Sequence, residues 1–444
     1  MKRLISTYIL TILLVFLFSS FQIYYFIRPF NSSKVIDYIG YLSSDSLNGR
    51  LAGTVDNALA AQYIKEQFQV KNLQPYKGSY YESFQVKYPY KMDGKPYLKV
   101  FDQNKKLVKE FNYGTDYKED MLNFKINNIS FNKNDIAALS DYTTQVTKGM
   151  DKVVFYTPEK NNINFRSSFI NDSSISLFIM VTQKANEEIN NMLKNGYTVS
   201  CYIPYEIRDT EINNVTACIK GKNPKLSPII IGGHFDHVGT DLNGTIYSGA
   251  LDNASGISFV MELSDYISSL GRPERDIIFV GFNAEEFGCV GSTKFVEKYK
   301  SDLNGAKVFN FDMIGSNNSV PLCIMGGDMD TNNTPLIKSA ANICKSNKVY
   351  FNYLFENSSD HESFRKENID AITFIDNDLS RIHTPNDKVS YIDSKSIDRC
   401  FNVVSQEVIS NAFNNNFLYL YYKEIMVISL ILISALIFLN RDLQ

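Results

Sequence analysis

Histidine and carboxylate residues gather in five short groups in the second half of the sequence. The groups occupy positions 232–237, 249–256, 283–288, 312–315 and 381–387. Two imidazoles and three carboxylates, with a further carboxylate to spare, make up a ligand set that zinc takes in proteins. The residue types therefore predict a metal site whose members lie far apart in the sequence. The candidates are His234, Asp236, His237, Asp252, Glu285, Glu286, Asp312, His383 and Asp387.

Two of the groups favour a site with two metal ions. Two divalent ions held about 3.5–4 Å apart need a carboxylate that bridges them. Asp252 is the best candidate, because it lies in a tight loop flanked by Gly249 and Gly256. The side chains of neighbouring Glu285 and Glu286 point apart. One of them can therefore bind a metal while the other stays free as a general base.

The elements that must position these residues are apolar strands that alternate with helices. A lone histidine or aspartate after a strand is commonly structural, as part of a helix cap or a turn. Here every group follows an apolar strand or lies in the loop beyond it. Such alternation predicts an α/β fold with a mostly parallel central sheet flanked by helices, whose carboxyl edge binds ligands. We expect strands at 227–232, 276–282, 308–311 and 370–375, and a helix at 256–270.

The first half of the sequence supplies a different kind of structure. Residues 57–69 have apolar positions at helical spacing, and short alternating runs between 96 and 210 predict a small β-rich insert. We expect this insert to contribute packing or access control rather than chemistry. The predicted organisation is an anchor at 1–29, the start of the catalytic domain at 30–95, the insert at 96–210, the rest of the catalytic domain at 211–416, and a second anchor at 417–440.

Both ends of the chain are apolar enough to cross a membrane. Residues 4–27 form an apolar run without a charged residue, and residues 417–439 form another whose only charged residues are Lys423 and Glu424. Lys2 and Arg3 place both termini in the cytoplasm, so the middle of the chain is expected at the cell membrane on the extracytoplasmic side. A cleaved signal peptide is the alternative for the first run, and a buried or interfacial helix for the second.

Composition excludes several other classes of protein. The 45 basic and 48 acidic residues leave a net charge of -3, which gives no electrostatic case for binding nucleic acid. The six cysteines form no C-x-x-C pair, which excludes a zinc knuckle or a thioredoxin-like motif. We expect them to be buried apolar residues, with one or two disulfides as the alternative.

Taken together, the five groups resemble the co-catalytic dizinc aminopeptidases of metallopeptidase family twenty-eight, whose members include aminopeptidase Y, glutamate carboxypeptidase II and glutaminyl cyclase. The resemblance covers roughly residues 34–415 and includes the segment 49–54. It implies a zinc-exopeptidase fold and two zinc ions, one held by His234 and Asp312 and the other by Glu286 and His383, with Asp252 bridging them. It makes Glu285 the general base.

The resemblance also implies supporting roles around the metals. Asp236 would accept a hydrogen bond from the other ring nitrogen of His234, and Asp387 would anchor the loop of His383. The segment 359–364 resembles a loop that the family places near the site, so His361 is expected to line the pocket. For His237, lining the site and simple packing are equally open.

The function implied is removal of amino-terminal residues from peptide substrates, with membrane lipid around the terminal helices. Glutaminyl cyclase or other zinc amidohydrolase activity is the alternative from the same family. The family's cyclases use one zinc ion, whereas this chain retains ligands for two. A receptor that uses a non-catalytic peptidase domain is the alternative from another class, and such relatives lose metal ligands.

Overall fold

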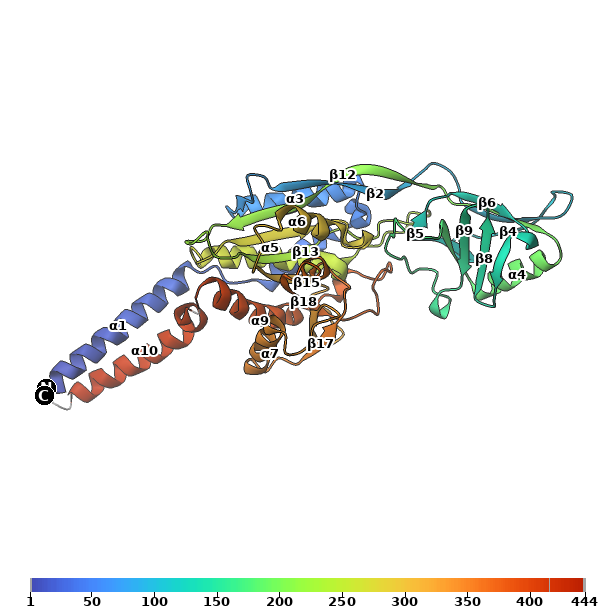
Figure 1. Ribbon diagram of the computed structural model, residues 1–444. Coiled ribbons are helices and arrows are strands. Elements are labelled where there is room, and N and C mark those ends of the chain that lie inside the picture. The colour runs from blue at the N-terminus through green and yellow to red at the C-terminus, as the bar shows by residue number, and fades with distance from the viewer. Residues whose placement is uncertain (1, 415, 442–444) are drawn as a thin grey trace.

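The computed structural model describes residues 2–414 and 416–441. A central α/β domain carries a β-rich lobe at one end and a pair of long helices at the other (Figure 1). The central domain holds the candidate site, and the β-rich lobe packs against it. The two terminal helices extend away from both (Figure 1).

The central domain is built on a nine-stranded sheet. Its middle strands are β14 (Ile277–Phe282), β13 (Ile229–His234), β15 (Lys307–Asp312) and β18 (Asp370–Asp376), and neighbours among them pair in parallel. The outer strands β12 (Tyr205–Ile219) and β16 (Leu322–Gly326) join antiparallel, and β17 (Phe351–Phe355) pairs parallel to β16. The two short or bent strands β1 (Gln74–Pro75) and β2 (Tyr81–Lys91) pair with β12. The α/β fold with a parallel centre is confirmed.

Helices cover both faces of this sheet. Successive residues of β13 alternate between two apolar clusters, with Ile229 and Ile231 in one and Ile230 in the other. Residues buried on both sides of a strand explain its uninterrupted apolar sequence. The first face is covered by α2 (Ser32–Leu42), α3 (Val55–Val70), α5 (Gly256–Ser269), α7 (Pro335–Ser346) and α9 (Ser394–Ala412), and the second by α6 (Val290–Tyr299) and α8 (His361–Arg365). All six cysteines are buried and unbonded.

The β-rich lobe lies between β2 and β12, which run from the central sheet into it (Figure 1). One of its sheets contains β3 (Tyr97–Phe101), β4 (Leu107–Phe111), β6 (Asn128–Phe131) and β11 (Thr198–Tyr202). The other contains β5 (Tyr117–Phe124), β7 (Ile136–Leu139), β8 (Thr143–Lys148), β9 (Asp151–Tyr156) and β10 (Leu177–Val181), and α4 (Gln183–Lys194) packs beside them. The lobe's apolar core continues into Val238 and Tyr247 of the central domain, so the two parts are packed together.

The terminal helices α1 (Lys2–Phe26) and α10 (Phe417–Arg441) lie side by side and extend away from the central domain (Figure 1). Aromatic rings connect them, with Phe16 6.1 Å from Phe417 and Tyr24 6.5 Å from Tyr422. Each contains a stretch long and apolar enough to cross a membrane, Leu4–Phe26 and Phe417–Phe438, and only 6% of each is buried. So much exposed apolar surface suggests that a bilayer surrounds the pair.

Candidate metal centre

The five polar groups meet at the carboxyl edge of the parallel strands. His234 and Asp312 are the last residues of β13 and β15, and Glu285 lies in the turn that follows β14. His383 lies in the loop after β18, and the loop with Asp252 leads into α5. A cavity of about 330 Å³ opens between them, lined by Ser168, His234, Asp252, Glu285, Glu286, Asp312, Met313, Leu354, Glu356, Ser358, Ile375, Asn377, Leu379, Ile382 and His383.

The side chains form two clusters. Within each cluster, the nitrogen and oxygen atoms that could bind a metal all lie within 4.8 Å of one another. The His383 cluster consists of His237, Asp252, Glu286 and His383, and all four are buried. The His234 cluster consists of His234, Glu285 and Asp312, of which only Glu285 is partly exposed. The resemblance to family twenty-eight implies no metal-binding role for His237, and it implies the role of general base for Glu285. In the structure both residues belong to the clusters.

Asp252 connects the two clusters through its two carboxylate oxygens. Its Oδ1 lies 3.6 Å from Nε2 of His234, and its Oδ2 lies 3.2 Å from Nε2 of His383. On the far sides, Nε2 of His234 is 3.5 Å from Oδ1 of Asp312, and Nε2 of His383 is 3.1 Å from Oε1 of Glu286. One carboxylate therefore faces both imidazoles, with a second carboxylate beside each of them.

Gathering these groups shifts their pKa values in opposite directions. Burial disfavours the charged form of His383, but Glu286 and Asp252 outweigh it and raise the pKa of the imidazole well above its usual value. Burial likewise opposes the charge of Glu286, yet His383 and His237 hold the pKa of that carboxyl well below its usual range. The His383 imidazole and the Glu286 carboxylate thus stabilise each other's charged form.

Glu285 behaves differently from Glu286. Burial raises the pKa of Glu285 well above its usual value, and the carboxylate of Glu286 adds to the shift although His234 opposes it. Glu285 also lines the cavity and keeps 15% of its side chain exposed, against 1% for Glu286. A carboxyl group that opens into the cavity and holds a proton readily is suited to proton transfer.

The donor atoms fit a divalent metal. Oδ1 of Asp312 is buried and has no hydrogen-bond partner among the described residues, although it faces His234. Buried polar atoms normally have a hydrogen-bond partner. The Asp312 oxygen and the His234 nitrogen face each other without such a bond, and a cation between them would satisfy both. Imidazole nitrogen and carboxylate oxygen are the ligands that zinc takes in sites with an open position. The residues present therefore fit zinc in both clusters.

The two supporting aspartates hold backbone rather than rings. Asp236 accepts hydrogen bonds from the backbone N–H groups of Glu285 (3.1 Å) and Glu286 (3.2 Å). Its distance of 3.7 Å from Nδ1 of His234 is too long for the hydrogen bond that the resemblance implies. Asp387 accepts hydrogen bonds from the backbone N–H groups of Leu251 and Asp252. It therefore ties the loop of Asp252 to the loop of His383.

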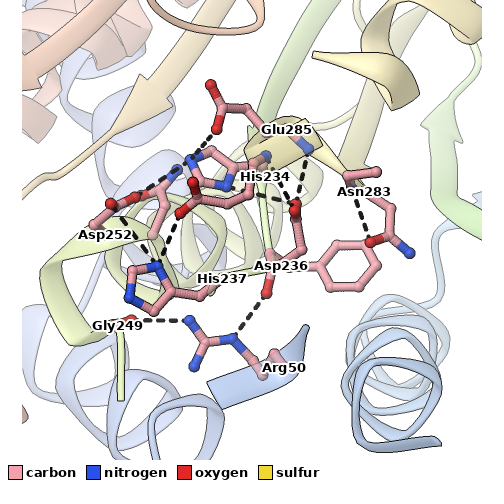
Figure 2. A network of polar contacts seen from close by, with 12 residues as sticks. Arg50, His234, Asp236, His237, Gly249, Asp252, Asn283 and Glu285 are labelled. Atoms are coloured by element: carbon pink, nitrogen blue, oxygen red, sulfur yellow. Dashed lines mark hydrogen bonds and ion pairs between the residues drawn. The ribbon is translucent and has the colours of Figure 1, made fainter. Parts of the chain in front are cut away.

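Arg50 supports the same loops from below the site. The segment 49–54 turns sharply at Gly49, whose φ is +69°, and buries the guanidinium group of Arg50 completely. That group donates to the backbone carbonyls of Phe235, Ser248 and Gly249 at 2.8–2.9 Å. Figure 2 shows the bond to Gly249. Burial lowers the pKa of Arg50 to about 10, against the pull of the nearby aspartates. One side chain thus links the strand end of His234 to the loop of Asp252.

A segment of the β-rich lobe reaches the site, which sequence reasoning missed. The Ser168 hydroxyl donates to Oε2 of Glu286 at 2.6 Å, and the Phe169 N–H donates to the Glu286 carbonyl at 2.8 Å. The Arg166 N–H donates to the carbonyl of His383 at 3.1 Å, and the Phe165 ring stacks on the His383 ring at 5.6 Å. No motif in residues 165–169 indicates these contacts, because a single hydroxyl and backbone groups provide them. The insert, expected to contribute packing or access control, therefore also contacts two of the candidate site residues, Glu286 and His383.

Of the remaining two histidines, His237 belongs to the site and His361 does not line it. Nδ1 of His237 lies 3.0 Å from Oε1 of Glu286, so this ring is part of the site. His361 is not among the residues that line the cavity. It is fully buried, with its nitrogens at 2.9 Å from the Thr373 hydroxyl and 3.0 Å from the Glu356 carbonyl. The loop of His361 does reach the site, but through Ser359, whose hydroxyl donates to Oδ2 of Asp312 at 2.8 Å.

Comparison with known proteins shows which sequences and folds this chain is similar to. Residues 214–408 match the model of peptidase family M28. Aminopeptidase YwaD of Bacillus subtilis (strain 168) is 28% identical over 207 residues, which cover 44% of this chain and 44% of that protein. The chain thus matches less than half the length of this curated relative.

Solved structures show the same fold over more of the chain. An aminopeptidase from Aneurinibacillus sp. strain AM-1 matches with a TM-score of 0.61 at 21% identity, over 86% of this chain and 94% of that structure. A zinc aminopeptidase from Bacillus subtilis gives a TM-score of 0.60 at 16% identity, over 86% and 96%. The range that matches peptidase family M28, residues 214–408, contains every member of both clusters.

Proposed function

We propose that this chain is a membrane-anchored, zinc-dependent aminopeptidase. The observation that carries the proposal is the position of Asp252, whose two oxygens face His234 and His383 separately while Glu285 opens into the same cavity. The family match and the aminopeptidases of the same fold support it. His234 and Asp312 would hold one zinc ion, and Glu286 and His383 would hold the other, with Asp252 available to both.

The residues divide the work of peptide hydrolysis. Zinc bound in the clusters supplies Lewis acidity, which makes water a nucleophile at neutral pH and polarises the substrate carbonyl. Glu285 takes the proton from the attacking water and delivers it to the amine that leaves. His237 keeps Glu286 oriented by its contact with Oε1.

The cavity indicates which substrates fit. Its wall includes the apolar side chains Met313, Leu354, Ile375, Leu379 and Ile382, which can surround the first side chain of a peptide. The carboxylate of Glu356 lies in the same wall and can pair with a free amino terminus. A volume of about 330 Å³ is at the small end of ligand pockets, which favours one residue over a longer segment.

A substrate panel on the purified full-length chain tests the proposal. We expect zinc-dependent cleavage of leucyl and methionyl anilides, at least tenfold slower cleavage of glutamyl and lysyl anilides, and none of acetyl-leucyl anilide. Glu285→Gln should retain zinc and lose activity by about 10²–10⁴-fold, as removal of a general base does. Equal cleavage of the blocked substrate would remove the aminopeptidase assignment. Cyclisation of amino-terminal glutamine with one bound zinc would favour a glutaminyl cyclase.

The membrane part of the proposal has its own test. We infer that α1 and α10 both span the bilayer and that the catalytic domain lies on the extracytoplasmic side, since Lys2 and Arg3 favour a cytoplasmic amino terminus. The chain should stay in the membrane pellet at alkaline pH, and protease added outside intact cells should digest the catalytic domain. Release at alkaline pH, or protection from external protease, would contradict this arrangement.

A further inference from the structure

A second cavity, of about 500 Å³, lies where α1 joins the catalytic domain. Its walls come from Arg28, which follows α1, from residues 71–74 after α3, and from 218–220 at the end of β12. Ser268 near the end of α5, and Gly271 and Arg272 beyond it, complete them. These are the ends of elements that face the terminal helices (Figure 1). The cavity is separate from the metal centre, with which it shares no lining residue.

The charge of this cavity is one-sided. Among the described residues that line it, none is acidic, whereas four carry a positive charge. Asn72, Gln74 and Ser268 add neutral hydrogen-bonding groups to the same wall. The cations are Arg28, Lys71, Lys220 and Arg272.

Carboxylates outside the lining compensate only part of this charge. Arg28 pairs with Asp265 at 3.0 Å, and Lys220 pairs with Asp276 at 2.8 Å. The hydrogen-bond partners of the other two cations are neutral, although Asp265 and Glu262 favour the charged form of Lys71 from farther away. Nζ of Lys71 donates to the Tyr38 hydroxyl at 3.1 Å and to the side-chain oxygen of Gln67 at 3.4 Å.

Arg272 is the second of these cations whose hydrogen-bond partners are neutral. Its guanidinium group donates to the backbone carbonyls of Lys220 (3.3 Å) and Gly221 (2.8 Å), which fix its direction without cancelling its charge. Lys71 is only 8% exposed, and burial lowers its pKa to about 8, so an anion nearby would stabilise its charged form. A fixed arginine and a buried lysine at one cavity are groups that recognise phosphate.

The position of the cavity indicates the source of the phosphate. Arg28 lies two residues beyond the end of α1, so its height along the helix is that of the bilayer's polar surface if α1 spans. Cations at this level interact with the head groups of anionic lipids.

We propose that this cavity binds a phosphate group, and that the group is the head group of an anionic phospholipid in the leaflet next to the catalytic domain. The proposal rests on membrane anchorage by α1 and α10 and does not depend on peptidase activity. Occupation of the cavity holds the catalytic domain in a fixed orientation against the bilayer surface.

Lipid binding to the purified full-length chain in detergent tests the proposal. Native mass spectrometry would follow titration with dioleoyl phosphatidylglycerol, with dioleoyl phosphatidylcholine and with inorganic phosphate. We expect phosphatidylglycerol to bind at least tenfold more tightly than phosphatidylcholine. Lys71→Gln/Arg272→Gln should weaken phosphatidylglycerol binding by about thirtyfold, since each cation near the surface contributes about 1 kcal/mol. Exposed lysines of α4, at the opposite end of the molecule, give the matched control Lys184→Gln/Lys194→Gln.

Each result decides a different part of the proposal. Equal phosphatidylglycerol binding by the wild type and the Lys71/Arg272 variant would overturn it. Inorganic phosphate that binds as tightly as the lipid, and is lost in the same variant, would keep the phosphate site but overturn the lipid as its source. Arg28→Gln/Lys220→Gln, whose side chains are 52% and 47% exposed, repeats the test without disturbing the interior. Peptide hydrolysis, measured alongside, should be unchanged in all these variants.

Discussion

The two metal clusters differ in what holds their ligands in place. His234 and Asp312 are terminal residues of parallel strands, so backbone pairing within the sheet fixes both of them. His383 instead lies in a loop with a φ of +54°, a left-handed conformation that a non-glycine residue keeps only when its surroundings impose it. Those surroundings include the β-rich lobe, which contacts both His383 and Glu286.

This difference makes the lobe part of the architecture of the candidate site. A strand end is placed by the register of the sheet, whereas a loop ligand needs contacts from outside its own element. Here the segment 165–169 supplies them through one side-chain hydrogen bond, two backbone hydrogen bonds and one ring contact. The buried ion pair of Arg166 with Glu119 at 2.9 Å fixes this segment within the lobe. The His383 cluster should therefore be the more sensitive to changes in the lobe.

Asp252→Asn gives the largest expected effect, because Asp252 faces the histidines of both clusters. The amide keeps the size of the side chain but removes the charge shared between His234 and His383. Zinc content, measured by mass spectrometry of the purified chain, should fall from two ions to one or none. Activity should fall by at least about 10³-fold, because a lost metal forfeits several kcal/mol of transition-state stabilisation. Asp209→Asn, at an exposed position of β12, is the matched control, and an Asp252 variant that retains both ions would contradict the shared role.

Ser168→Ala should weaken the His383 cluster selectively. The variant removes the hydroxyl that donates to Oε2 of Glu286, and loss of such a contact commonly costs about 10–100-fold in metal affinity. Competition with a fluorescent zinc chelator would show one of two binding constants reduced. In an Asp312→Asn background, which disables the other cluster, the reduction should persist.

Two further variants separate the hydroxyl from general disturbance of the lobe. Ser168→Thr keeps the donor and should restore most of the affinity, while Ser174→Ala changes an exposed serine of the same loop and should have no effect. Unchanged zinc affinities in Ser168→Ala would show that the lobe covers the site without positioning its ligands.

The same contrast explains what the sequence could predict. Strands with uninterrupted apolar sequences, such as β13 and β14, carry a strong signal, and the ligands at their ends follow from the topology of an α/β sheet. Ser168 carries no comparable signal, because one serine in a loop acquires its role only when the lobe packs against Glu286. Asp387 was recognised as a supporting residue, but its partners belong to another loop that sequence spacing does not bring near.

Ser359→Ala is the counterpart of Ser168→Ala in the His234 cluster and should have the smallest effect. The Ser359 hydroxyl donates to Oδ2 of Asp312 at 2.8 Å, as the Ser168 hydroxyl does to Glu286. Asp312, however, remains paired with Ile375 of β18 when that hydroxyl is removed. We therefore expect its zinc affinity to fall by less than about tenfold, below the usual range for supporting contacts. Ser346→Ala, at an exposed position of α7, is the control for the same chelator competition. A loss as large as that of Ser168→Ala would mean that strand ends and loops depend equally on outside support.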